Sequence, residues 1–368
     1  MEMKQWKDIL HIVSGKNQNA VENPNGKYPI YGSGGLMGYA DDYLCEAGTT
    51  IVGRKGTINR PIFVTEPFWN IDTAFGIAPD KGLDPKYLYY FCVHFNFMPL
   101  DKSTGRPSLA KSDLLKIEMP VPSISEQKRI VARIEELFSQ LDAGVEMLKK
   151  TKAQLAVYRK AVLKDMFDGA IGCKTDTIQS VCSNIVDCPH STPKWVGDGK
   201  ICLRTTNFKR GYLDLSEKNY VSEETFDKRN ARLIPQPGDV LYSREGAILG
   251  IACIIPEDLF VCLGQRMMLL RVNEKMLGRF LMHYLNSPKV TSFVAAKTGG
   301  SASPHVNVGD IKEFVVPIPS ISEQKKMLEQ IESRLSVCDS IEKTVDTALQ
   351  QAEAMRQSIL KNAFEGRL

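Results

Sequence analysis

The chain of 368 residues is long enough for two or three domains, each with a buried core. Its 43% hydrophobic and 24% charged residues exclude a disordered or fibrous chain, and its net charge of +4 is too small to indicate a nucleic-acid partner by itself. Nine cysteines without a CxxC pair, no apolar run long enough to span a membrane and no signal-peptide core favour a reduced, cytoplasmic setting.

Residues 1–117 are predicted to form a mixed α/β domain. The segment 49–53 is rich in β-branched side chains and predicts a strand, whereas the glycine-rich segment 32–35 predicts a turn. Residues 85–97 carry aromatic and aliphatic side chains at helical spacing after an Asp-Pro start, which predicts a buried helix.

Residues 118–170 are predicted to form a long helix. The sequence Pro-Ser-Ile-Ser-Glu-Gln-Lys at 122–128 recurs at 319–325, an offset of 319 − 122 = 197 residues. Within it, Ser123 and Glu126 have the spacing of a capping box. Apolar residues then recur at every seventh position, namely Ile134, Leu141, Leu148, Leu155 and Val162. Such a heptad seam requires a partner helix.

Residues 171–316 are predicted to form a second domain built like the first. The segment GTTIVGRKGTI at 48–58 aligns with GDVLYSREGAI at 238–248. Both segments predict a strand that leads into the pattern Arg-x-Gly-x-Ile, with Arg54 opposite Arg244. The duplication therefore includes the domains as well as the helices.

Residues 317–368 are predicted to form the second helix. Its seam consists of Ile331, Cys338, Val345, Ala352 and Ile359. Each helix has one apolar stripe and no local element to bury it, so the two stripes are expected to cover each other. The predicted fold class is α+β, with two mixed α/β globular domains separated by an antiparallel two-helix coiled coil and related by a pseudo-twofold internal repeat.

A search for catalytic motifs predicts a chain that is not an enzyme. The sequence contains no P-loop, no HExxH or GxSxG motif and no aromatic tetrad of the amino-methyltransferases. Its five histidines are scattered without ligand spacing, so no metal site is predicted. We therefore assign no catalytic residue and expect this chain to bind no cofactor.

Polar residues in turn-prone segments are the candidates for contacting double-stranded DNA. Arginine suits bidentate contact with guanine, and serine, threonine and lysine suit phosphate. The candidates are Tyr31, Ser33, Arg54, Lys55, Arg106, Ser108, His190, Thr192, Lys194, Arg204, Thr205, Asn207, Lys209, Ser243, Arg244, Ser301, Ser303 and His305. Ordinary solvated loops are the alternative, and for the matched pair Arg54 and Arg244 the alternative is a structural ion pair.

The repeated segments at the helix starts are candidates for contacting a partner protein. They are more alike than capping requires, and two equivalent copies favour two equivalent partners on a pseudo-dyad. The candidate residues are Ser125, Glu126, Gln127, Ser322, Glu323 and Gln324.

The whole pattern resembles the specificity subunit of a type I restriction-modification system. The resemblance rests on the two Pro-x-Pro-x-x-x-Glu-Gln helix starts, the ending Phe-Glu-Gly-Arg-Leu, and the segments 28–33 and 238–246 within the domains. It implies that each domain is a target-recognition domain that reads one half of a bipartite DNA site, and that the helices set the spacer and dock methyltransferase subunits.

The resemblance also implies which partners carry out the chemistry. Methyltransferase subunits would use S-adenosylmethionine for DNA methylation at adenine, and restriction and motor subunits would use ATP and magnesium. By position, the resemblance places Arg54, Arg106, Arg204 and Arg244 in DNA-contacting loops. The alternative function is a coiled-coil scaffold whose end domains bind protein or carbohydrate rather than DNA.

Overall fold

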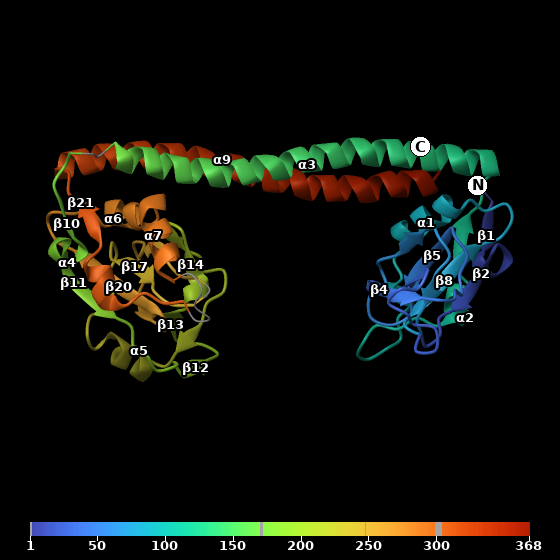
Figure 1. Ribbon diagram of the computed structural model, residues 1–368, viewed down its shortest axis with the longest axis horizontal. Coiled ribbons are helices and arrows are strands. Elements are labelled where there is room, and N and C mark those ends of the chain that lie inside the picture. Colours follow the sequence, from blue (N-terminus) through green and yellow to red (C-terminus); the bar gives the residue numbers. More distant parts are fainter. Residues whose placement is uncertain (1, 170–171, 247, 299–303) are drawn as a thin grey trace. The chain divides into compact units, whose positions relative to one another are not determined.

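The computed structural model describes residues 2–169, 172–246, 248–298 and 304–368. The chain divides into two compact units, one made of Met1–Lys149 with Asp346–Leu368 and the other of Lys150–Val345. Two long helices, α3 (Ile124–Asp168) and α9 (Ile321–Phe364), contribute residues to both units (Figure 1). Each unit also contains one globular domain of mixed strands and helices.

The domain of the first unit contains two sheets of three or more strands, together with the antiparallel pair of β1 and β9. One of the two sheets has the order β2-β8-β5-β6 and is antiparallel, and the other has the order β4-β3-β7, in which β3 and β7 are parallel. The elements are β1 (Met3–Gln5), η1 (Trp6–Asp8), β2 (Leu10–Ser14), β3 (Tyr28–Gly32), β4 (Gly35–Ala40), β5 (Thr49–Gly53), β6 (Ile62–Val64), β7 (Trp69–Asn70), β8 (Ala74–Pro79), α1 (Pro85–His94), η2 (Met98–Leu100), α2 (Lys111–Leu114) and β9 (Glu118–Pro120). The strand and the buried helix predicted from the sequence are β5 and α1.

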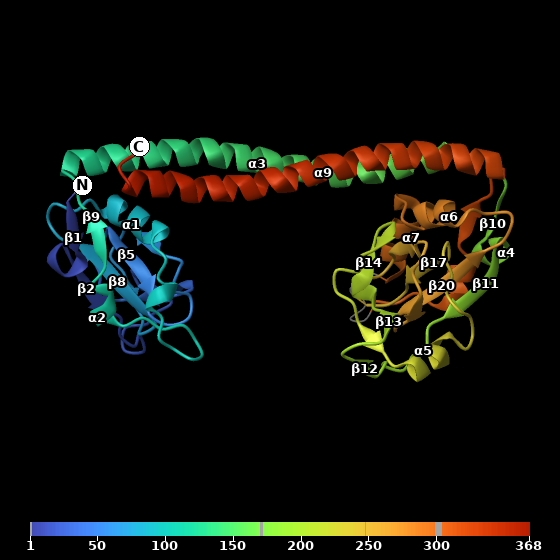
Figure 2. The same cartoon turned by 180° about the vertical axis from the view of Figure 1, so that it is seen from behind.

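The domain of the second unit repeats this plan. It contains two four-stranded sheets. One has the order β11-β20-β17-β18, and Figure 2 labels its strands β11, β20 and β17. The other has the order β12-β16-β13-β19, in which β13 and β19 are parallel. The elements are β10 (Thr175–Thr177), α4 (Ile178–Val181), β11 (Cys182–Asp187), β12 (Trp195–Val196), β13 (Lys200–Leu203), η3 (Thr205–Asn207), β14 (Phe208–Lys209), β15 (Tyr212–Leu213), β16 (Tyr220–Val221), α5 (Glu223–Asn230), β17 (Val240–Ser243), β18 (Ala252–Ile254), β19 (Val261–Leu263), β20 (Met267–Val272), α6 (Gly278–Leu285), α7 (Pro288–Thr298), α8 (Val308–Lys312) and β21 (Val315–Pro317).

Each domain packs on the start of one long helix and the end of the other. In the first unit, Ile134 of α3 and Phe364 of α9 join the same core, and the Phe364 ring lies 5.2 Å from Tyr87 of α1. In the second unit, Ile331 of α9 and Phe167 of α3 join one core, and the Phe167 ring lies 5.3 Å from Phe280 of α6. The two anchoring aromatic residues are 197 positions apart, as the repeat requires.

Within each unit the two helices are antiparallel, as predicted. In the first unit, Arg356 of α9 pairs with Asp142 of α3. In the second unit, Arg159 of α3 pairs with Asp339 of α9 at 2.7 Å. Exchanging each residue for its repeat equivalent converts one of these two ion pairs into the other, as the predicted pseudo-twofold relation requires.

The repeated glutamine of each helix start is buried and joins the helix to its own domain. Gln127 accepts a hydrogen bond from the Asp84 amide and donates to the carbonyls of Gly82 and Pro122, at 2.8, 3.0 and 2.8 Å. Gln324 accepts from the Leu277 amide and donates to the carbonyls of Lys275 and Pro319, at 2.8, 2.8 and 2.9 Å.

Both glutamine side chains are 0% exposed, so they do not lie on a surface where a partner protein could contact them. At this glutamine, the similarity of the two repeated segments is therefore explained by hydrogen bonds inside each unit.

The helices also begin later than the predicted bounds of 118 and 317. Residues 118–120 form strand β9, which pairs with β1, and Pro317 ends strand β21, which pairs with β10.

Replacing Gln127 or Gln324 with leucine should destabilise the protein by about 2–3 kcal/mol, because each change leaves buried backbone groups without hydrogen-bond partners. Urea unfolding measures the loss, and hydrogen exchange should assign it to the unit that carries the substitution. Gln154→Leu, at an exposed position of α3, is the control. Equal losses for the buried and exposed positions would contradict the joining role.

The second unit should lose stability in mild acid because of His283 in α6. Burial, together with the nearby Arg279, lowers the pKa of His283 from its usual 6.5 to about 4. Between these values the unfolded chain binds a proton that the folded chain does not, so stability is complete above pH 6.5 and falls as the pH drops toward 4. We expect a loss of about 2 kcal/mol at pH 5, which His283→Gln should abolish in pH-dependent urea unfolding. An unchanged pH dependence in this variant would contradict the assignment.

Candidate nucleic-acid interface

In the first unit, the turn after β5 and the loop before α2 lie side by side. The Gly56 amide donates to the Pro107 carbonyl at 2.8 Å, and the Leu109 amide donates to the Arg54 carbonyl at 2.8 Å. Gly56 has a φ of +87°, and a side chain there would meet the Arg106 guanidinium. The predicted residues Arg54, Lys55, Arg106 and Ser108 are therefore brought together.

The other two predicted residues of the first unit are partly or wholly covered. Ser33 is buried beside Gly53 at the end of β5. Tyr31 stacks edge-to-face on Phe68, with the ring centres 5.6 Å apart, and burial raises the pKa of its hydroxyl. Tyr31 thus contributes to the domain core more than to a solvent-facing contact.

A polar cavity of about 580 Å³ lies beside the Arg54 turn. Its polar lining consists of Arg54, Lys102, Lys111, Ser14, Ser103 and Ser108, without a carboxylate. The sequence analysis missed Ser14, Lys102 and Lys111, because they come from β2, from a long loop and from α2 and meet only in the folded domain. The Asp101 carboxylate shapes this loop by accepting hydrogen bonds from the amides of Ser108 and Ser103, which lower its pKa.

The second unit contains the equivalent turn. The Gly246 amide donates to the Pro304 carbonyl at 3.0 Å, and the Val306 amide donates to the Arg244 carbonyl at 2.9 Å. Pro304 and Val306 are the repeat equivalents of Pro107 and Leu109, so both domains build this junction alike. His305 is brought next to Glu245, whereas Ser301 and Ser303 lie outside the described residues.

Arg244 forms an ion pair inside its domain and is not exposed for contact with DNA. Only 6% of it is exposed, and its guanidinium donates to both oxygens of Asp187, at 2.8 and 3.0 Å. It also pairs with Glu245 at 2.6 Å. Burial opposes the positive charge, but the two carboxylates outweigh it and raise the pKa of Arg244. The structural alternative considered for this residue therefore describes it better.

Two further predicted residues of this unit are buried and form hydrogen bonds within the domain. Asn207 is buried, and its side chain accepts from the Arg204 amide and donates to the carbonyls of Asp214 and Glu217. Ser243 is 0% exposed, and its hydroxyl both donates to and accepts from the backbone of Ile251. Polar side chains in turns often form such hydrogen bonds with the backbone. The sequence alone does not show which of them do so and which face the solvent.

The remaining predicted residues of the second unit are accessible, apart from the half-buried Thr205 in η3. His190, Thr192, Lys194, Arg204, Lys209 and His305 are exposed. The Arg204 guanidinium lies 5.7 Å from the centre of the Trp195 ring, and Lys209 lies 3.7 Å from Asp214.

Arg229 and Gln265, which the sequence analysis missed, hold these loops in place. The buried guanidinium of Arg229 donates to the carbonyls of Pro189, Ser191, Leu263 and Gly264. Gln265 accepts a hydrogen bond from Thr192 and donates to the His190 carbonyl. These contacts join the loop after β11 to the turn between β19 and β20.

The predicted partner-contacting residues other than the glutamines lie at the solvent-facing starts of the helices. Ser125, Ser322 and Glu323 are exposed, and Glu126 is half-buried. Glu126 pairs with Arg129 at 2.7 Å, whereas Glu323 forms a reciprocal capping box with Ser320. Hydrogen bonds to Arg129 and to Ser320, respectively, lower the pKa of Glu126 and of Glu323, so both carboxylates are charged at neutral pH.

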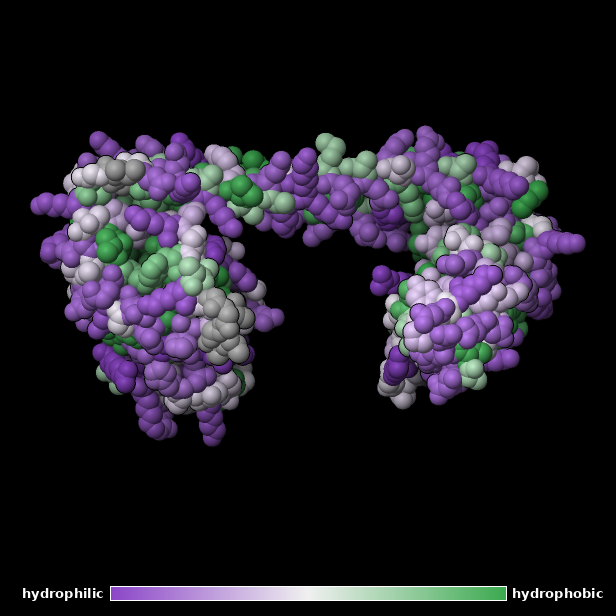
Figure 3. Space-filling model, in the orientation of Figure 1, coloured by the Kyte–Doolittle hydropathy of each residue, from purple (hydrophilic) through white to green (hydrophobic). Residues whose placement is uncertain are grey.

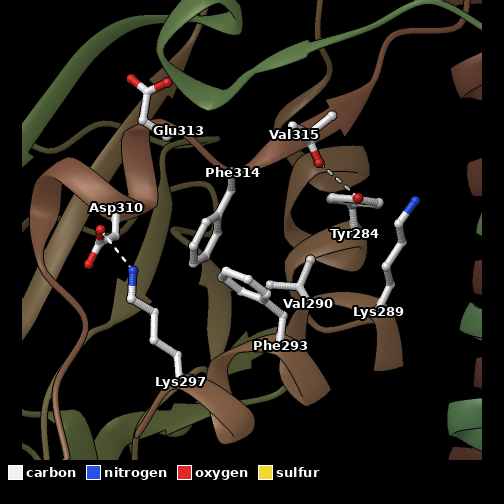
Figure 4. Close-up of a pocket in the computed structure, with 9 residues that line it drawn as sticks. All are labelled: Tyr284, Lys289, Val290, Phe293, Lys297, Asp310, Glu313, Phe314 and Val315. Atoms are coloured by element: carbon white, nitrogen blue, oxygen red, sulfur yellow. Dashed lines mark hydrogen bonds and ion pairs between the residues drawn. The ribbon is translucent and has the colours of Figure 1, made fainter.

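A second cavity, of about 350 Å³, is apolar and lies at α7 and β21 in the second unit (Figure 4). Phe293 and Phe314 meet edge-to-face there, and Tyr284 donates to the Val315 carbonyl. No predicted DNA-contacting residue lines this cavity. The view in Figure 3 shows mainly hydrophilic residues over both domains.

Among the described residues, no group of three or more histidine, cysteine, aspartate or glutamate side chains is arranged to hold a metal ion. In the same part of the chain, no helix has both the length and the hydropathy needed to cross a membrane.

Comparison with known proteins identifies a family. The family model of the type I restriction modification DNA specificity domain matches residues 1–156 and 193–351. The specificity subunit of the type I restriction enzyme EcoBI from Escherichia coli is 25% identical over 350 residues, which are 86% of this chain and 73% of that protein. The EcoKI specificity subunit of Escherichia coli strain K12 is 24% identical, with the same coverage of both chains.

Solved structures share the fold. A chain from a structural study of the assembly and conformational transition of the type I R-M system superposes with a TM-score of 0.76 at 17% identity, over 100% of this chain and 98% of that chain. The HsdS subunit of Thermoanaerobacter tengcongensis superposes with a TM-score of 0.55 at 17% identity, over 100% and 97%. Because the family model matches more than half of its residues, the chain belongs to the family of type I restriction modification DNA specificity subunits.

Proposed function

We propose that each domain reads one half of a split DNA site, that the paired helices fix the spacing of the halves, and that the helix starts dock methyltransferase subunits. The observation that carries this proposal is the duplicated junction of an Arg-x-Gly turn with a proline-containing loop, built alike in both domains at 2.8 and 3.0 Å. Two recognition surfaces of one design on one chain fit two half-sites separated by a spacer.

In this proposal the partner subunits perform the chemistry. Methyltransferase subunits use S-adenosylmethionine to methylate an adenine flipped out of the duplex, and motor and restriction subunits use ATP and magnesium. The chain itself selects the DNA and binds no cofactor.

Mapping methylated adenines in the DNA of cells with and without this gene tests the function. We expect one split motif to be methylated only when the gene is present. The purified chain without partners should neither cleave DNA nor transfer methyl groups to it. An unchanged methylation map in cells that contain the methyltransferase subunits would contradict the proposal.

Deleting one heptad from each long helix at equivalent positions should shorten the spacer. Seven helical residues span about 10.5 Å, close to three base pairs at 3.4 Å each. Deleting residues 147–153 together with 344–350 preserves the seam and the symmetry of the pair. We expect a methylated motif with the same half-sites and a spacer about three base pairs shorter. An unaltered spacer would exclude the helices as the ruler.

We propose that Arg266, in the turn between β19 and β20, is an arginine of the second domain that reads a base. It is exposed, and none of the described residues pairs with its guanidinium. Its φ of +66° lies in the left-handed region, which is unfavourable for an arginine. The neighbouring Arg229 and Gln265 hold the turn, so the backbone strain is imposed by its surroundings.

Replacing Arg266 with glycine should relieve this strain and reduce recognition. We expect an equal or higher melting temperature, together with a loss of about tenfold or more in discrimination at one base pair of one half-site. Asp258→Gly, which removes the other described left-handed residue that is not glycine, should affect the melting temperature similarly and leave recognition unchanged. Unchanged discrimination by Arg266→Gly at every base pair would contradict this assignment.

A further inference from the structure

The two domains differ at one strand position beside the shared arginine turn. In the larger sheet of the first unit, Ser14 at the end of β2 pairs with Phe75 of β8. In the second unit, Asp187 at the end of β11 pairs with Met268 of β20. Phe75 and Met268 each occupy the second position of their strand, so Ser14 and Asp187 are equivalent.

Arg54 and Arg244, the arginines beside these two positions, form equivalent backbone hydrogen bonds. The Arg54 amide donates to the Thr73 carbonyl at 2.8 Å, and the Arg244 amide donates to the Arg266 carbonyl at 3.0 Å. In the second domain the Asp187 carboxylate receives the guanidinium in a bidentate pair. In the first domain a serine replaces the carboxylate, and no carboxylate among the described residues pairs with Arg54.

Arg54 instead lines the polar cavity of about 580 Å³, together with Ser14. Its guanidinium donates a long hydrogen bond of 3.4 Å to the Asp72 carbonyl and lies 5.7 Å from the centre of the Phe75 ring. The two lysines of the lining are already oriented, since Lys102 pairs with Asp113 at 2.7 Å and Lys111 donates to the Ile12 carbonyl at 2.7 Å.

We propose that this cavity in the first domain binds a phosphate of the DNA backbone, in the place where the second domain has its own carboxylate. Phosphate and carboxylate accept the same bidentate pair of hydrogen bonds from arginine. The three cations of the lining and its serine hydroxyls supply further donors. This inference rests on the proposed function and assigns one recognition contact to the first domain.

Introducing into the first domain the carboxylate that Asp187 supplies in the second domain tests the inference. Ser14→Asp should pair with Arg54 as Asp187 pairs with Arg244, so the variant should be as stable as the wild type or more stable. In the complete subunit with its methyltransferase partners, we expect weaker binding to duplex DNA that carries the mapped site. The slope of log K against log salt should fall by about 0.9, the value for one lost phosphate contact.

Matched variants separate the charge from the change of size. Ser14→Asn has nearly the same shape as the aspartate variant but no charge, and it should keep the wild-type slope. Arg54→Ala should lose the same contact as Ser14→Asp. With wild-type protein, a neutral methylphosphonate at one backbone position of one half-site should weaken binding, and the same substitution should have no further effect with Arg54→Ala.

The outcomes distinguish the inference from the function on which it rests. If the wild-type complex binds its mapped site specifically and Ser14→Asp leaves the salt slope unchanged, the phosphate site is excluded while the function stands. If the wild-type complex shows no sequence-specific binding, the proposed function itself fails. If inorganic phosphate raises the melting temperature of the wild type but not of Ser14→Asp, and the DNA salt slope does not change, the cavity binds a free anion and the DNA assignment is overturned.

Discussion

Each domain depends on a contact between segments that are far apart in the sequence, namely the start of one long helix and the end of the other. In the first unit, Gln127 at the start of α3 and Phe364 at the end of α9 contact the domain, and in the second unit Gln324 at the start of α9 and Phe167 at the end of α3 do so. A buried amide that satisfies three backbone groups fixes direction as well as distance, which apolar packing alone does not. The two cores are thus completed only when α3 and α9 are antiparallel within each unit.

This arrangement separates the residues that hold a domain in place from those that can recognise a ligand. The anchoring residues recur at the 197-residue offset because both domains need the same contacts. The loops beyond the strand ends carry no such constraint once their backbone junctions are made. Side chains there can differ between the two domains, and at the equivalent positions Ser14 and Asp187 a single difference alters the charge that the neighbouring arginine faces.

The architecture could be predicted from the sequence because it depends on periodic patterns and on a long internal repeat. The heptad positions required a partner helix, and the equal offset required an antiparallel one. Individual roles were less predictable. Gln127 and Gln324 stood out because they recur, but recurrence does not distinguish an internal hydrogen bond from a partner contact. The role of Arg229 could not be predicted, because its four carbonyl partners come from two chain segments that meet only after folding.

The pair Arg54 and Arg244 shows why identity within a repeat is weak evidence for a shared function. The two arginines follow equivalent strands, β5 and β17, and form equivalent backbone hydrogen bonds. Arg244 is nevertheless buried against Asp187, whereas Arg54 lines an open polar cavity. The difference comes from a neighbour on an adjacent strand, which sequence alignment of the two segments does not include. Strand register is therefore the information that the sequence lacked, because register alone places Ser14 or Asp187 beside the arginine. Such a cross-strand neighbour decides whether the repeated arginine of this chain is buried in an ion pair or lines a polar cavity.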